Sequence, residues 1–185
     1  MSIDKDGMTM NANSSQLPRE CKEINQNYHF EVHAGTDYAQ DTPGNIFGYD
    51  LNEFEVEPCS LVQITLVNDD DIRHQWMIHG LPRYIYPGGM FHLEAAGGQS
   101  RTGSFIVPGN DATLLVHCDM AQHMEKGMKA QLIVGKGGKD LWAVAGVSSP
   151  FLRADYLSRT QLGWLIISAI LAALGVFFIA QRRRS

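Results

Sequence analysis

The sequence predicts an all-β fold, a Greek-key β-sandwich, followed by one C-terminal α-helix. The sandwich is indicated by about seven short runs of alternating or β-branched residues, each bounded by glycine, proline, asparagine or aspartate. The helix is indicated by one long uncharged run near the end of the chain. The expected strands cover residues 28–33, 54–57, 61–67, 74–79, 102–107, 112–116 and 129–134.

The chain of 185 residues is long enough for one domain with attachments at both ends. Residues 1–27 are polar without a clear period, and we expect them to form a disordered or wrapping arm. The expected segments after the arm are the sandwich domain (28–137), a linker (138–161), a transmembrane helix (162–181) and a basic tail (182–185).

The run from Leu162 to Ala180 contains no charged residue. At roughly 1.5 Å per residue it extends about 28 Å, close to the thickness of a bilayer core. Trp164 lies near one end, where an interfacial tryptophan is favoured, and three arginines follow the other end. Because basic residues favour the cytoplasmic side, we expect a single-pass protein of the cell membrane. Its domain would be periplasmic or otherwise extracytoplasmic, and its C-terminus cytoplasmic. Residues 1–20 show no apolar signal segment, so the route of export stays open.

The net charge and the cysteine content limit the classes of function that the sequence supports. The net charge of −5 argues against a nucleic-acid partner and is compatible with a basic redox partner. Of the three cysteines, Cys21 and Cys59 either pair in an oxidising compartment or remain unrelated thiols, and the sequence does not decide between these. We find neither a Ser-His-Asp set nor a phosphate-binding loop.

One loop near the middle of the chain carries three metal-binding side chains at short spacing: Cys118, His123 and Met128. A thiolate, an imidazole and a thioether together suit copper that cycles between two oxidation states, because soft sulfur favours Cu(I) and nitrogen serves both states. The best candidate for a second imidazole, which would complete a trigonal His₂Cys plane, is His74 at the start of the expected strand 74–79. Met128 would then be the weak axial ligand.

From about Tyr28 to Gly135 the sequence resembles the cupredoxins, and its loop is most similar to the last copper loop of multicopper oxidases. The resemblance rests on the cysteine, histidine and methionine of the loop together with a histidine upstream. It implies a cupredoxin-like domain that holds one type 1 (blue) copper through His74, Cys118, His123 and Met128. In the same loop, Met120 and Met124 are interpreted as an apolar rim or partner-docking patch, with Met124 as a competing sulfur ligand the alternative.

Two further histidines raise the question of a second copper. His79 follows His74 by five residues, and His117 directly precedes Cys118. The resemblance implies that these two positions correspond to additional copper ligands of copper nitrite reductases and multicopper oxidases. A trinuclear cluster is not expected, because Met77 and Asp119 replace histidines of the oxidase motif.

Two imidazoles are too few for a closed copper site. A second copper on His79 and His117 would therefore need a third ligand from another subunit, for which His92, His33 and His29 are candidates. The alternative is that His79 and His117 are structural residues of the sandwich.

The function that these features favour is a membrane-anchored type 1 copper protein that carries electrons to or from a membrane redox enzyme or a cytochrome. An electron carrier is favoured over a catalyst, but the sequence leaves the choice open. One alternative is an oligomeric copper oxidoreductase, like a nitrite reductase or an oxidase, with a second copper at the subunit interface. The other is a copper-delivery protein, which the extra methionines of the loop would suit.

Overall fold

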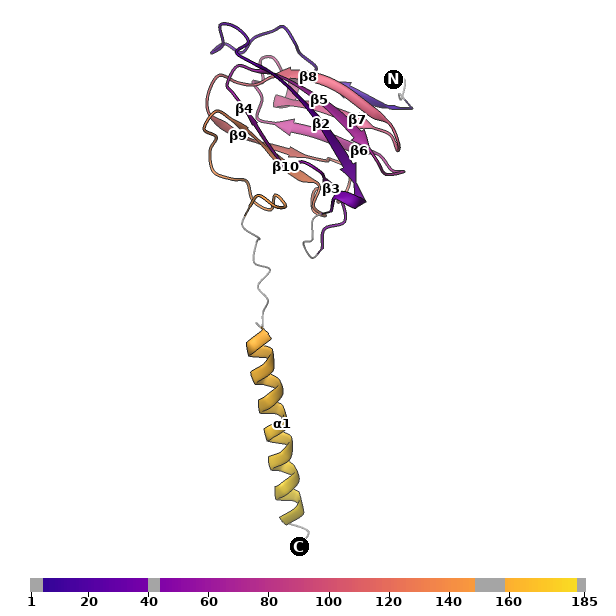
Figure 1. The fold of residues 1–185 in the computed structure, drawn as a ribbon, viewed down its shortest axis with the longest axis vertical. Helices are drawn as coiled ribbons and strands as arrows, with labels where there is room; N and C mark the ends of the chain where they lie inside the picture. The colour runs from indigo at the N-terminus through magenta and orange to yellow at the C-terminus, as the bar shows by residue number, and fades with distance from the viewer. Residues whose placement is uncertain (1–4, 40–43, 149–158, 183–185) are drawn as a thin grey trace. The chain divides into compact units, whose positions relative to one another are not determined.

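The computed structural model describes residues 5–39, 44–148 and 159–182, with side chains in the last segment described over 160–173. The chain divides into two compact units, Met1–Pro150 and Phe151–Ser185. The first unit contains every strand of the described residues, and the second contains the helix α1 (Arg159–Arg182) (Figure 1).

The first unit is a sandwich of two β-sheets (Figure 1). In spatial order, the larger sheet contains β1 (Gly7–Met10), β7 (Met90–Ala95), β6 (His74–His79), β9 (Ala112–His117), β10 (Lys129–Val134) and β4 (Glu53–Val56). The smaller sheet contains β3 (Gly48–Tyr49), β2 (Asn27–Gly35), β5 (Leu61–Asn68) and β8 (Ser100–Ile106). Strand β10 pairs in parallel with β4 and β2 with β5, and the other described pairs are antiparallel. The predicted all-β sandwich is thus confirmed.

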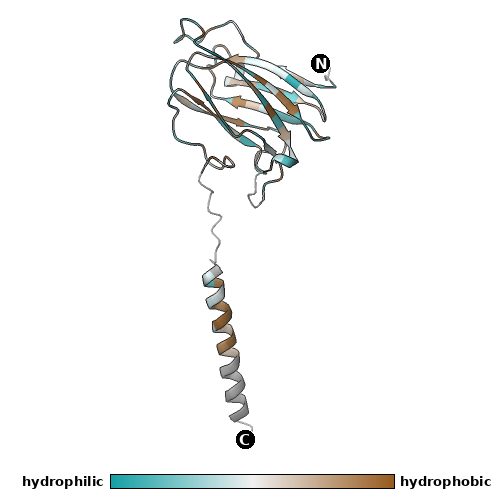
Figure 2. Cartoon of the chain, in the orientation of Figure 1, coloured by the Kyte–Doolittle hydropathy of each residue, from teal (hydrophilic) through white to brown (hydrophobic). Residues whose placement is uncertain are grey.

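The core lies between the two sheets and is rich in aromatic rings. Trp76 is fully buried, and its ring centroid lies 5.9 Å from those of Phe54 and Phe105. Because side chains alternate along a strand, Trp76 and Ile78 of β6 face this core while Gln75, Met77 and His79 face the other way. Figure 2 shows that the strands of the sandwich carry both hydrophobic (brown) and hydrophilic (teal) residues. Strand β6 therefore presents chemically different side chains to its two faces.

The pairing of β6 and β9 determines where the metal-binding residues meet. Met77 is opposite His117 and Ile78 is opposite Val116 in this antiparallel pair. His74 begins β6, whereas Cys118 follows the last residue of β9. Antiparallel pairing consequently brings the start of β6 next to the end of β9.

The N-terminal arm expected over residues 1–27 contains a strand. Strand β1 pairs with β7 and forms one edge of the larger sheet. Farther along the arm, Cys21 forms a disulfide with Cys59, with a sulfur–sulfur distance of 2.02 Å. The pairing that the sequence left open is therefore present, and it ties the arm to the residues just before β5.

All seven expected strands are present within two residues of their predicted bounds, and the sequence pattern missed β1, β3 and β7. In β7 the apolar residues Phe91, Leu93 and Ala95 do alternate inward, but the other face carries Met90 and His92 rather than exposed polar residues. Strand β3 spans two residues, too few for a periodic pattern.

Part of the expected linker over 138–161 packs against the sandwich. The amide of Leu141 donates to Oε1 of Gln131, and Nζ of Lys129 donates to the carbonyl of Trp142. The linker residues 149–158 lie outside the described part of the chain, as do residues 183–185 of the expected basic tail.

The transmembrane helix expected over 162–181 is contradicted. Within the described residues, no helix combines the length and the apolar character needed to cross a membrane. The expected single-pass anchor is therefore wrong, and with it the membrane location and the orientation that depended on the anchor.

Candidate metal centre

Three of the predicted ligands meet at one end of the sandwich. His74, Cys118 and His123 each offer one donor atom, and these atoms all lie within 4.8 Å of one another. Nδ1 of His123 lies 3.2 Å from Nδ1 of His74 and 3.4 Å from Sγ of Cys118. His74 and Cys118 are fully buried, and His123 is 8 % exposed. The structure thus gathers two imidazoles and a thiol into one enclosed cluster.

Asp70 orients His74 within this cluster. The Nε2 atom of His74 lies 2.7 Å from Oδ2 of Asp70, and the amide and hydroxyl of Thr36 donate to the same carboxylate. The His74 interaction and the Thr36 hydrogen bonds hold the pKa of Asp70 below its ordinary value, against the opposing effect of burial. A proton on Nε2 donated to Asp70 leaves the Nδ1 lone pair directed at the cluster, the arrangement found around metal-binding histidines.

The Cys118 thiol lies against the start of β6. The amide of Gln75 donates to Sγ of Cys118 at 3.3 Å. Burial raises the pKa of this thiol to about 11, although hydrogen bonds from the amides of Met120 and Gln75 lower it. Because the thiolate is the form that binds a metal, the metal ion must displace a proton from Cys118 when it binds.

Phe47, from the loop before β3, covers the two imidazoles. Its ring stacks on His123 at a centroid distance of 4.0 Å and meets His74 edge-on at 5.7 Å. The pKa of His123 is lowered, mainly by burial and secondarily by the neighbouring His74. The neutral imidazole, which is the metal-binding form, is therefore favoured at neutral pH.

The loop from Cys118 to Met128 closes on itself through backbone hydrogen bonds. The amide of Met128 donates to the carbonyl of His123 at 3.0 Å, and the amide of Cys118 donates to the carbonyl of Met128 at 3.2 Å. Gly127 has a φ of 109°, and a Cβ built there would meet the Asn45 side chain at 2.6 Å, so the turn requires glycine. The Met128 side chain is fully buried at the end of this loop. Its assignment as the axial ligand stays a prediction.

The donor set fits copper better than the common structural or alkaline-earth metals. Two imidazoles and one thiol, with a buried methionine after them, are typical of a mononuclear site for copper that changes oxidation state. The two-sheet topology with this loop between β9 and β10 completes the pattern. The sandwich is cupredoxin-like, and its His-Cys-His cluster matches a type 1 copper loop.

Comparisons with solved structures find distant similarity to auracyanins and to multicopper oxidases. A structure of auracyanin B is 15 % identical, covers 71 % of this chain and 99 % of its own, and has a TM-score of 0.48. Auracyanin from Roseiflexus castenholzii is 19 % identical with a TM-score of 0.45, over 60 % of this chain and 98 % of its own. A multicopper oxidase from Pediococcus acidilactici is 19 % identical with a TM-score of 0.44, over 61 % of this chain but only 27 % of its own.

No protein-family model and no curated protein matches the sequence. Because the structural likenesses are distant, we take the fold from the sheet topology and the centre from its own ligand geometry. Asp70 and Phe47 belong to the centre, yet the sequence pattern did not single them out. For Asp70 the available signal is its position four residues before His74.

The residues suggested for a second copper lie on the opposite face of the larger sheet. The rings of His79 and His117 are nearly parallel, with centroids 5.0 Å apart. His29 and His33, considered as donors from another subunit, lie on β2 and interact with Thr65 and Asp69. The interface copper stays a prediction.

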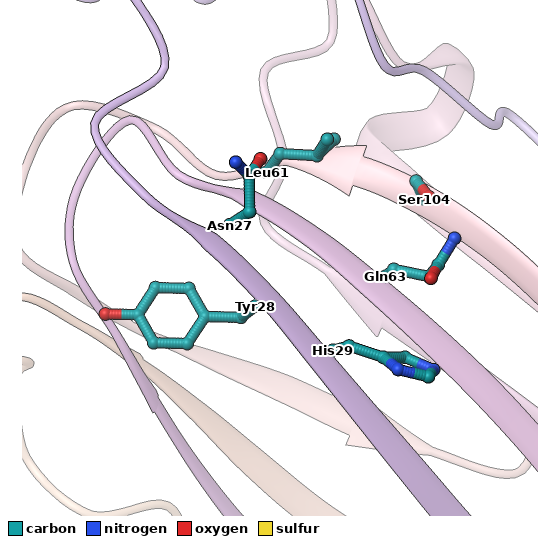
Figure 3. A pocket seen from close by; sticks show the side chains of 6 residues that line it. All are labelled: Asn27, Tyr28, His29, Leu61, Gln63 and Ser104. Carbon is teal, nitrogen blue, oxygen red and sulfur yellow. The ribbon is translucent and has the colours of Figure 1, made fainter.

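A shallow hollow of about 220 Å³ lies elsewhere, on the solvent face of the smaller sheet (Figure 3). It is lined by residues of β2, β5 and β8, among them His29, Gln63 and Ser104, which are opposite one another in the strand register. None of the three clustered ligands lines this hollow, so it is separate from the metal centre.

Proposed function

We propose that this protein is a blue-copper electron carrier whose single redox centre is held by His74, Cys118 and His123, with Met128 as the weak axial ligand. The observation that carries the proposal is the convergence of the two Nδ1 atoms and the Sγ atom in a buried cluster. Ligands fixed by strands and by a hydrogen-bonded loop present nearly the same geometry to both oxidation states of copper. Such a centre needs little rearrangement when an electron arrives or leaves.

Electrons would pass through His123, the one ligand of the three that retains some exposure. Phe47 stacks on its ring, and Met120 and Met124 belong to the same loop and are partly buried. We propose that these apolar side chains are the docking surface for a redox enzyme or cytochrome. The auracyanins among the structural neighbours include one described as a "blue" copper protein, which supports the proposed type of centre.

The enclosure of the ligands favours an electron carrier over a copper-delivery protein. Delivery requires the metal to exchange readily with an acceptor, and solvent-accessible sulfur ligands suit that task. Here the thiol is fully buried and the imidazoles are covered by Phe47. Copper held in this way is expected to leave slowly.

The experiment that tests the function is a redox titration of the copper-loaded protein, followed by repeated cycles of reduction and oxidation against a chelator. We expect one electron per copper of the centre, full recovery of the visible absorption after each cycle, and no copper in the chelator. Transfer of copper to the chelator on reduction would instead support delivery. Turnover of nitrite or oxygen would support an oxidoreductase.

A further inference from the structure

The backbone of Gln75, the residue after His74, lies where the pairing of β6 with β9 ends. Strand β9 ends at His117, which is opposite Met77, so Gln75 lies beyond the end of that strand. In an antiparallel ladder the N–H and C=O of one residue point toward the same neighbouring strand. The N–H of Gln75 points toward Cys118, just after β9, and its C=O therefore points the same way. Both groups need partners from outside the ladder.

Two side chains take the place of the missing strand. The amide of Gln75 donates to Sγ of Cys118 at 3.3 Å, and the carbonyl of Gln75 accepts a hydrogen bond from the hydroxyl of Tyr49. Cys118 and Tyr49 are fully buried, and Gln75 is 9 % exposed. Burial, and secondarily Cys118, raise the pKa of Tyr49 well above 10, so its hydroxyl keeps the proton that it donates. The sulfur and the Tyr49 hydroxyl thus hold the two peptide groups that flank one residue.

Tyr49 is fixed by the segment that also covers the imidazoles. It is the last residue of β3 and is opposite Ala34 of β2, in the smaller sheet. The amides of Ile46 and Phe47, just before β3, donate to the carbonyl of Lys126 in the loop between β9 and β10. Because its own chain is tied to the smaller sheet and to this loop, Tyr49 is a rigid donor to the Gln75 carbonyl.

The side chain of Gln75 is anchored separately. Its Nε2 atom donates to Oε2 of Glu94 at 2.8 Å, and Nη1 of Arg73 donates to Oε1 of the same carboxylate at 2.7 Å. Glu94 is also the residue opposite Gln75 in the pair of β6 and β7. Removal of the Tyr49 hydroxyl is therefore expected to loosen the backbone of Gln75 without detaching the residue from the sheet.

The hydrogen bond to the sulfur matters for the oxidation state of bound copper. An N–H group directed at a thiolate withdraws electron density from the sulfur, so less of it reaches Cu(II). The oxidised state is then stabilised less, and the reduction potential is higher. Hydrogen bonding around the cysteine sulfur is one of the means by which a protein sets the potential of such a centre.

We propose that Tyr49 is a positioning residue of the redox centre, whose hydroxyl holds the Gln75 backbone so that its N–H bonds the Cys118 sulfur and raises the reduction potential. A buried carbonyl that loses its donor is destabilised and moves toward another partner, and the N–H of the same residue moves with it. The effect on the potential rests on the proposed electron-carrier function. The restraint on the Gln75 amide does not, because it is present without copper.

The test compares Tyr49→Phe with Tyr86→Phe. Both tyrosines are fully buried, and each hydroxyl donates to a backbone carbonyl. Tyr86 bonds Ile106, which is opposite Leu61 at the start of β5, whereas the metal centre lies beyond the other end of that strand. Each substitution removes one buried hydroxyl, so a general loss of stability affects both variants, and a change at the centre is expected only in the first.

The first measurement is a redox titration of the copper-loaded proteins against a reference couple. In Tyr49→Phe we expect the equilibrium constant for reduction to fall by about two- to tenfold, the range that one hydrogen bond contributes to an equilibrium. Tyr86→Phe should titrate as the wild type does. The second measurement is hydrogen exchange of the Gln75 amide in the metal-free proteins, followed by ¹⁵N NMR. Relative to the other amides of β6, this amide should exchange faster in Tyr49→Phe than in the wild type and in Tyr86→Phe.

Three results would overturn the proposal: an unchanged potential in Tyr49→Phe, an equal shift in Tyr86→Phe, or a Gln75 amide that Tyr49→Phe does not expose to faster exchange. Failure of the electron-carrier function would look different. The wild type itself would then show no reversible reduction of its copper, and the exchange of the Gln75 amide in the metal-free protein would still decide whether Tyr49 restrains it.

Discussion

The chemistry of the first centre depends on which nitrogen of His74 is free. Nε2 of His74 donates a hydrogen bond to Oδ2 of Asp70, so Nδ1 remains for the metal. His123 also directs Nδ1 into the cluster, and Phe47 covers its ring. The side chains that contact the two histidines thus determine which of their nitrogen atoms face the metal.

The substitution Asp70→Asn tests this role. It removes the charge that orients His74, and loss of such a partner typically lowers metal affinity by about 10–100-fold. We expect a decrease of that order in the copper affinity, measured by competition with a chelator, with the fold unchanged. The matched control is Asp71→Asn, the exposed neighbouring carboxylate, which should bind copper as the wild type does. Equal affinities in the two variants would show that Asp70 does not orient the ligand.

The three ligand candidates that the structure brings together could be found from sequence, because they follow a short spacing within one loop and one strand start. Asp70 and Phe47 could not be assigned in this way. Phe47 lies 27 residues before His74, and its contact depends on how the loop before β3 packs over the end of the sandwich. Packing of this kind produces no periodic pattern in the sequence.

Tyr86 connects two elements of the sandwich through a buried hydroxyl. The amide of Ile106, at the end of β8, donates to this hydroxyl at 2.8 Å, and Nδ2 of Asn13 donates at 2.9 Å. In Tyr86→Phe the Ile106 amide stays buried without a partner, which we expect to lower the free energy of unfolding by about 1–3 kcal/mol. Denaturant unfolding measures the change. Tyr84→Phe, at a side chain that is 44 % exposed, should change it by less than about 0.5 kcal/mol, and equal losses in both variants would contradict the account.

The disulfide between Cys21 and Cys59 closes a loop with a sequence separation of 38 residues. For a loop of this length, the chain-entropy treatment gives about 4 kcal/mol of stabilisation. We expect the double variant Cys21→Ser/Cys59→Ser to lose about 2–4 kcal/mol in denaturant unfolding. Reductant should destabilise the wild type but leave the double variant unchanged, whereas an equal effect on both would argue against the bond.

The loop after β5 carries a pH-dependent contact with β2. Nδ1 of His33 lies 2.7 Å from Oδ2 of Asp69, and this hydrogen bond is the main reason that the pKa of His33 is raised from 6.5. Protonated His33 therefore stabilises the fold fully below about pH 6.5, and this contribution is lost as the pH rises through the raised pKa.

Because both side chains are about one-third exposed, we expect a contribution of only a few tenths of a kcal/mol. The measurement is the free energy of unfolding on both sides of this pH window, for the wild type and for His33→Gln. The difference between them should shrink as the pH rises. A difference that stays constant or grows would contradict the assignment.

Strand prediction succeeded for β2, whose apolar and polar residues alternate, and for β5, which is a run rich in β-branched and apolar residues. It failed for β7, whose outward face carries His92 and Met90 in place of exposed polar residues.

For the molecule as a whole, the sandwich could be predicted from sequence, whereas the membrane span was wrong. The span was inferred from the apolar run between Leu162 and Ala180, and no helix of the described residues meets the requirement for crossing a membrane. The enclosure of the metal centre was not visible from sequence either. It arises because β6 and β9 are neighbours in the sheet although 32 residues separate His79 from Ala112 in the chain.

The central claim is that one copper ion is bound by Sγ of Cys118 together with His74 and His123. The most direct test is X-ray absorption and visible spectroscopy of the copper-loaded protein, with Cys118→Ser as the comparison. The account predicts one short copper–sulfur bond with two nitrogen neighbours and an intense thiolate-to-copper absorption, both lost in Cys118→Ser. A copper spectrum without sulfur, or one that Cys118→Ser leaves unchanged, would contradict it.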